Sequence, residues 1–113
     1  MASIPRAQFG QIVLPTNNSP TPVIEIPSDV EVGTLSVRVL NAGQVVGPVT
    51  IWAVPAGDTE PEIRHLIEND YPLKPSATGL TFSLAVMAGF RIFAKTSSPN
   101  IVVCANTLNH HQA

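Results

Sequence analysis

The sequence predicts an all-β protein, an antiparallel β-sandwich, and three observations lead to this prediction. Short apolar segments alternate with period two, turn-forming residues separate them at intervals of roughly 8–12 residues, and prolines interrupt every long helical pattern. The 113 residues suffice for a single hydrophobic core. We therefore expect a jelly-roll or Ig-like body over residues 33–108, with one short helix, an extended N-terminal arm over residues 1–32 and a flexible tail over residues 109–113.

The first two strands of the body follow from alternation. In the segment 34–40, Leu35, Val37 and Val39 share one face, and polar residues lie between them. The segment 47–54 alternates in the same way. Each pattern is typical of a strand with one buried face.

The remainder of the body repeats this pattern. The turn-forming residues 97–100 predict a hairpin between the last two strands. Cys104 lies in an apolar run of the last strand and is expected to be a buried core thiol. The further extended segments are expected over residues 67–73, 78–86, 90–96 and 101–108.

One short segment has the features of a helix. Thr59 can cap it, Glu62 follows three residues later as the partner in a capping box, and Pro61 is tolerated in the first turn. Ile63 begins a short apolar stripe. We expect one or two helical turns near residues 61–66.

The N-terminal arm is rich in proline and almost uncharged. Five of the 11 prolines fall within the first 27 residues, and Arg6 is the only charged side chain before Glu25. Segments 8–14 and 23–26 are candidate edge strands, and their apolar side chains need cover from the body or from another subunit. For Trp52 the core is the expected position. If Ile51 faces inward, alternation places Trp52 on the opposite face, and because tryptophan is enriched at binding hot spots it joins these candidates. The predicted partner-binding residues are Phe9, Ile12, Val13, Leu14, Val23, Ile24, Ile26 and Trp52.

The composition excludes several partners. Only 12% of the residues are charged, against about 25% in an ordinary soluble chain. The net charge is −2 and no basic cluster is present, so we expect no nucleic-acid partner. No apolar run approaches the roughly 20 residues of a membrane helix and no secretory signal is visible, so no membrane partner is expected. The single cysteine excludes an internal disulfide.

Few residues suggest chemistry. His65 is expected to be solvated or at an interface, and His110 and His111 to belong to a polar chain end. No nucleophile–base pair, metal-binding signature or phosphate loop is visible, so we expect no enzyme activity, no cofactor and no metal site. A group of acidic residues is the best candidate for calcium or for an acid–base pair, but it lacks the regular spacing of a calcium loop. These residues are Asp58, Glu60, Glu62, Glu68 and Asp70.

The order of strands and turns over residues 33–107 also suggests a family. The segments that carry the likeness are Leu35–Leu40 with Asn41-Ala42-Gly43, Trp52-Ala53-Val54-Pro55, Leu66-Ile67-Glu68, Tyr71-Pro72-Leu73, Thr78-Gly79-Leu80, Ala88-Gly89-Phe90-Arg91-Ile92 and Ser97-Ser98-Pro99-Asn100-Ile101-Val102-Val103. In this order the body resembles the small β-sandwich structural proteins of tailed bacteriophages. Such proteins decorate heads as cement proteins or belong to tail and fibre assemblies.

The resemblance implies a virion structural protein, and we expect a head decoration (cement) protein that stabilises the shell. It would be assembled in the cytoplasm of the host bacterium, be located in the virion, form homo-oligomers and contact the major capsid protein or other virion proteins. A tail, collar, baseplate or fibre-attachment component is the alternative within this family. A small lectin-like or peptide-binding module is the alternative of another class. Removal of residues 1–27 is expected to leave a folded body that no longer binds particles.

Overall fold

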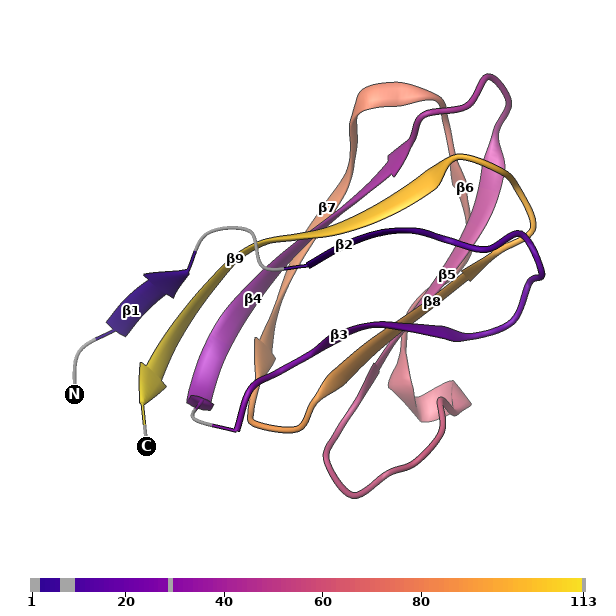
Figure 1. The fold of residues 1–113 in the computed structure, drawn as a ribbon. Helices are drawn as coiled ribbons and strands as arrows, with labels where there is room; N and C mark the ends of the chain where they lie inside the picture. Colours follow the sequence, from indigo (N-terminus) through magenta and orange to yellow (C-terminus); the bar gives the residue numbers. More distant parts are fainter. Residues whose placement is uncertain (1–2, 7–9, 29, 113) are drawn as a thin grey trace.

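The computed structural model describes residues 3–6, 10–28 and 30–112, which form a sandwich of two antiparallel sheets (Figure 1). The prediction of an all-β antiparallel sandwich is confirmed. The five-stranded sheet consists of β1 (Ser3–Arg6), β2 (Gly10–Val13), β4 (Val30–Asn41), β7 (Ser76–Val86) and β9 (Ile101–Gln112). The four-stranded sheet consists of β3 (Thr21–Glu25), β5 (Gly47–Val54), β6 (Leu66–Leu73) and β8 (Arg91–Thr96).

Most connections between successive strands cross from one sheet to the other. The strand orders are β1-β9-β4-β7, with β2 also beside β9, and β3-β8-β5-β6. The hairpin predicted at residues 97–100 is wrong, because β8 and β9 lie in different sheets. Thr96, at the end of β8, stabilises the turn that follows. Its hydroxyl donates to the carbonyl oxygen of Pro48 at 2.8 Å and accepts a hydrogen bond from the Ser98 N–H at 3.1 Å. Turn-forming residues show that the chain reverses, but not which strand it joins next.

The described part of the N-terminal arm is built into the sandwich. β2 pairs with β9 and β3 pairs with β8, both as edge strands. Leu14, Ile24 and Ile26 are buried in the core. The chain's own body therefore covers these apolar side chains. The boundary expected after residue 32 falls inside β4, where the strand runs without a break.

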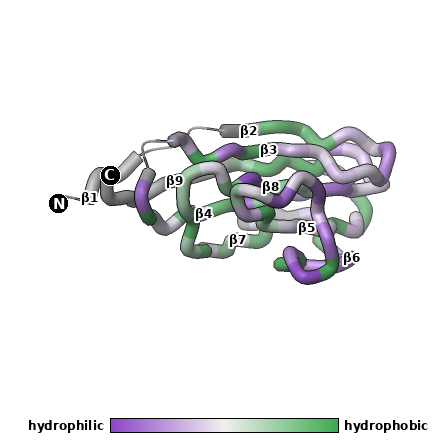
Figure 2. The backbone as a smooth tube through the Cα atoms, turned by 90° about the horizontal axis from the view of Figure 1, so that it is seen from below, coloured by the Kyte–Doolittle hydropathy of each residue, from purple (hydrophilic) through white to green (hydrophobic). Residues whose placement is uncertain are grey.

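The other end of the chain is also strand. β9 continues to Gln112, past the boundary expected at residue 108, and pairs with β4 and β1 there. β1 and the two chain ends lie together at one end of the molecule (Figures 1 and 2). β9 thus has strand neighbours along its whole length.

The core lies between the sheets and follows the predicted alternation. Leu35, Val37 and Val39 are each 0% exposed. Cys104 is half-buried, not buried as expected, because Ile101 and Val103 take the inward positions of β9. The same period of two that buries its neighbours places the thiol on the outer face of the sheet.

A bulge interrupts the pairing of β4 with β7. The register shifts between Val39 and Asn41, and Gly79 opposite has a positive φ of 65°. A Cβ at Gly79 would collide with the carbonyl oxygen of Val39, so only glycine fits there. Beyond the bulge, β7 pairs with β4 without interruption to Val86.

The predicted helix is a single 3-10 turn, η1 (Ile63–His65). Its N-cap is Glu62 and not the predicted Thr59, and the capping-box partner is His65. The helix stops because Leu66 is extended and begins β6, where it pairs with Trp52 of β5. Sheet pairing therefore ends the turn before a second turn can form. Among the described residues, no helix has the length and apolar character to cross a membrane.

Candidate functional site: the loop between β5 and β6

The predicted partner-binding residues fall into different environments. Phe9 lies outside the described residues. Ile12 and Val23 are partly buried against the core, and Val13 is 61% exposed. The arm residues that remain are the three core residues Leu14, Ile24 and Ile26. The structure therefore brings most of the described set to the inside of the sandwich.

Trp52, the last predicted contact residue, belongs to a second apolar cluster. We call it the outer cluster, and it consists of Trp52, Val54 and Phe93 with Leu66 packed against them. Because Ile51 points into the main core, alternation places Trp52 on the opposite face of the four-stranded sheet, as predicted. Trp52 is nevertheless only 9% exposed, so its ring is largely covered.

Two cations lie over the rings of the outer cluster. The guanidinium of Arg91 is 5.2 Å from the Phe93 ring centre, and the Lys95 ammonium is 5.9 Å from that of Trp52. At these distances a cation is attracted by the negative face of the ring. The aromatic faces are thus occupied by side chains of this chain.

Beside the outer cluster lies the β5–β6 loop, which we define as residues 55–65. It begins with a turn in which the Asp58 N–H donates to the carbonyl oxygen of Pro55 at 3.2 Å. Gly57 has a positive φ of 97°, a conformation that side chains rarely adopt. This turn directs the chain back towards β8.

Arg91 of β8 holds the loop. Its Nη2 donates to the carbonyl oxygens of Asp58 at 2.6 Å and Thr59 at 3.1 Å. Because both acceptors are backbone atoms, the contact fixes the path of the loop independently of the conformations of the loop's side chains. A strand of the sheet thereby positions a segment that has no strand neighbour of its own.

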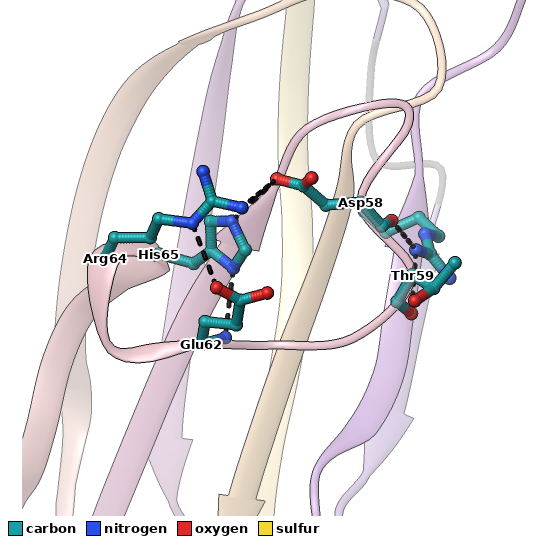
Figure 3. Close-up of polar contacts among 6 residues, drawn as sticks. Asp58, Thr59, Glu62, Arg64 and His65 are labelled. Atoms are coloured by element: carbon teal, nitrogen blue, oxygen red, sulfur yellow. Dashed lines mark hydrogen bonds and ion pairs between the residues drawn. The ribbon is translucent and has the colours of Figure 1, made fainter.

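His65 and Asp58 form a second anchor (Figure 3). The His65 Nε2 lies 2.9 Å from the Asp58 Oδ2, and the Glu62 N–H donates to the His65 Nδ1 at 3.0 Å. Since Nδ1 accepts, the ring proton is on Nε2 and is donated to the carboxylate. Only 4% of the His65 side chain is exposed, whereas a solvated or interface position was expected. Both ring nitrogens are used to hold the loop.

Arg64 completes the cluster on the solvent side (Figure 3). Its Nη2 lies 3.1 Å from the Asp58 Oδ2, and its Nε donates to the Glu62 Oε1 at 3.0 Å. The hydrogen bond that Arg64 donates to Glu62, followed by the negative charges of Asp58 and Glu62, raises the pKa of Arg64 above its ordinary value. Exposed pairs of this kind add little stability, so we regard them as fixing orientation.

The loop presents an apolar side chain to solvent. Ile63 is 87% exposed, the largest value among the exposed large apolar residues of the described chain. Next to the loop lies an open cavity of about 390 Å³. Its lining residues are Pro20, Thr59, Glu60, Pro61 and Phe93. A fixed loop that exposes an isoleucine is suited to contact with another macromolecule.

The acidic residues considered for calcium do not converge. In the described part of the chain, no three His, Cys, Asp or Glu side chains come together as metal ligands. Asp70 instead lies beside Thr50, whose hydroxyl is 3.4 Å from its Oδ1 and accepts its backbone N–H at 3.0 Å. Asp58 and Glu62 are engaged in the β5–β6 loop.

Sequence reasoning did not find the anchors of this loop. Asp58 and His65 are joined by an irregular loop segment, and Arg91 is 33 positions from Asp58, so no local pattern specifies either contact. The predicted helical stripe that begins at Ile63 does not form, because the helix is a single 3-10 turn. A signal for exposure was present, because charged residues flank Ile63 on both sides.

Comparisons of the chain with protein-family models, with curated proteins and with solved structures find no match.

Proposed function

We propose that this chain is a structural protein of a tailed-bacteriophage virion, a head decoration (cement) protein that binds the shell. The resemblance of residues 33–107 to small β-sandwich structural proteins of tailed bacteriophages suggests a virion protein. The structure supports a binding role through one observation: the buried histidine and its carboxylate hold a loop, and this loop exposes Ile63. A rigid apolar contact with charged neighbours is the composition expected of a docking site.

The proposed mechanism depends on repetition. Burying one isoleucine side chain supplies about 1.5–3 kcal/mol, which is weak for a single contact. Around a symmetric shell the same contact is repeated at every equivalent junction. Many weak contacts then restrain the shell together, and the fixed loop lowers the entropy lost at each of them.

The first test is the copy number of the polypeptide in purified virus particles, measured by quantitative mass spectrometry against the major shell protein. Hundreds of copies in a simple ratio to the shell subunit support head decoration. A few dozen copies or fewer would contradict head decoration and favour the tail, collar, baseplate or fibre component. Absence from particles would refute the virion proposal altogether.

The second test addresses the loop. We compare Ile63→Asp with Val45→Asp, a matched control because Val45 is 65% exposed and lies in the loop at the opposite end of β5. Binding to particles that lack the protein should weaken more than about tenfold for I63D and stay unchanged for V45D. Equal binding by I63D and the wild type would rule out the β5–β6 loop as the contact.

The lectin-like or peptide-binding alternative has one observation in its favour, the cavity beside Phe93. An exposed aromatic platform for sugars is not visible among the described residues in that region, because Trp52 is 9% and Phe93 7% exposed. Binding of a glycan or peptide array at micromolar strength, lost on Pro61→Trp in the cavity wall, would favour this alternative. No binding on such arrays would argue against it.

A further inference from the structure

The free edges of the two sheets differ in how they are protected. β6 carries Glu68, Asp70 and Pro72 with two register shifts against β5. β3 contains Pro22 and Glu25 and is also irregular. β1 and β2 have four residues each. Short length, charge, proline and bulges all discourage a second chain from pairing at an edge.

β7 has none of these features beyond its bulge. From Leu80 to Val86 it has no charge and no proline, and it pairs with β4 in uninterrupted register. β7 ends the strand order of the five-stranded sheet, and among the described residues its strand neighbour is β4 alone. It runs along the lower margin of the molecule in Figure 2. Its outer edge is therefore a regular, uncharged row of backbone donors and acceptors.

The inward side chains of β7 are also incompletely covered. Leu80, Phe82 and Leu84 pack against the core yet remain partly exposed. Their counterparts on the neighbouring strand β4 are 0% exposed. The difference arises because β7 has a neighbour on one side only, so apolar surface is left at the open edge of the sandwich.

We propose that β7 is a self-association edge, at which a second copy of this chain adds its own β7 in antiparallel pairing about Ser83. The two five-stranded sheets then become one continuous sheet. In this register Phe82 faces Leu84 of the second copy, and Leu80 faces its Val86. These are aromatic–aliphatic and aliphatic cross-strand pairs, which are favourable in sheets.

A second copy fits this edge for two further reasons. The strand is uncharged, so two copies approach without like-charge repulsion. Ser83 faces outward, and its Oγ lies 3.2 Å from the Oγ of Ser36 on β4. With Ser83 on the two-fold axis, this pair of hydroxyls continues as a polar row across the junction, and the outward face of the joined sheet stays hydrophilic. The proposal concerns the isolated protein and stands whether or not it belongs to a virion.

The test exploits the two-fold axis, which brings position 83 opposite itself. The wild type should sediment as a dimer at about 100 µM. Ser83→Lys and Ser83→Glu should each raise the dissociation constant of the dimer more than about tenfold, because like charges would lie directly opposite each other. An equimolar mixture of S83K and S83E should restore the dimer. Asn69→Lys, on the exposed edge strand β6, is the matched control and should remain dimeric.

A monomeric wild type at that concentration would overturn the proposal, and so would an S83K protein as dimeric as the wild type. A second measurement uses the unmodified protein and covers the case of a variant that does not fold. Amide hydrogen exchange of residues 80–86 should slow as concentration rises from the monomeric to the dimeric range, with exchange in β6 unchanged. If amide exchange in β7 does not depend on protein concentration, self-association through β7 is equally refuted.

Discussion

Residues 10–28 and the β5–β6 loop both contain proline and isoleucine, yet the isoleucines lie in opposite environments. Ile24 and Ile26 are 6% and 1% exposed, and Ile63 is 87% exposed. β3 carries Ile24 into the space between the sheets because it pairs with β8. Ile63 lies in a 3-10 turn that pairs with no strand of the described chain. For these isoleucines, pairing in a sheet together with a position on its inward face, more than apolar character, decides whether the side chain is buried.

The largest effect should come from deleting residues 1–27. The sequence alone predicts a folded remainder, but the structure predicts the opposite, because Leu14, Ile24 and Ile26 leave the core together with β2 and β3. Each such loss costs about 2–5 kcal/mol, against about 5–15 kcal/mol of total stability for a domain. Circular dichroism during urea titration should show no cooperative transition. A cooperative transition like that of the full chain would contradict the placement of these strands.

A single substitution sharpens the comparison. Ile26→Ala should lower the free energy of unfolding by about 2–5 kcal/mol, since Ile26 is 1% exposed. Val13→Ala is the control within the same region and should change it by less than about 0.5 kcal/mol, because Val13 is 61% exposed. Urea denaturation of both variants measures the difference. Equal effects would mean that residues 10–28 are not packed as described.

The anchor of the β5–β6 loop should give a smaller effect. His65→Ala removes the acceptor of the Glu62 N–H and the hydrogen bond to Asp58. We expect a loss of about 1–3 kcal/mol of unfolding free energy, the usual cost of unpaired polar groups in a part-buried site. Glu60→Ala, exposed in the same loop, is the control and should be nearly neutral. A neutral H65A would show that the loop does not depend on this anchor.

The smallest effect on stability is expected at Ile63, the exposed isoleucine of the β5–β6 loop. Ile63→Ala should shift the unfolding free energy by less than about 0.5 kcal/mol, because little apolar surface of Ile63 is buried in the chain itself. Thermal unfolding measures it, with Ile26→Ala as reference. A loss above about 1 kcal/mol would mean that Ile63 is packed in solution, and would remove it as a contact residue.

Much of the sandwich could be predicted because it follows a local period. Leu35, Val37 and Val39 show the buried face of β4 in the sequence itself, and Trp52 follows correctly on the face opposite Ile51. The pairing of β3 with β8 joins residues about 70 positions apart, and no local pattern specifies it. The N-terminal strands could therefore be found as extended segments but not assigned to a sheet.

The candidate site was less predictable because its contacts depend on the path of a loop. Thr59 and Glu62 satisfy the capping rule, yet Glu62 and His65 form the capping box because β6 begins at Leu66. The role of Arg91 depends on β8 lying beside β5, which brings its guanidinium to the loop backbone. Tertiary packing overrides the local capping signal at Thr59. It also creates the contact of Arg91 with the loop, for which the sequence holds no local signal.

The position of β9 in its sheet has a consequence for the order of folding. β9 spans residues 101–112, yet it lies between β4 and the N-terminal strands β1 and β2. On a ribosome, the four strands of the other sheet emerge before it and can pair first. The five-stranded sheet cannot close over them until residues 101–112 have been synthesised. Pairing between such distant segments is slow, so a nascent chain exposes the apolar face of β4 during this interval and is then most prone to aggregate.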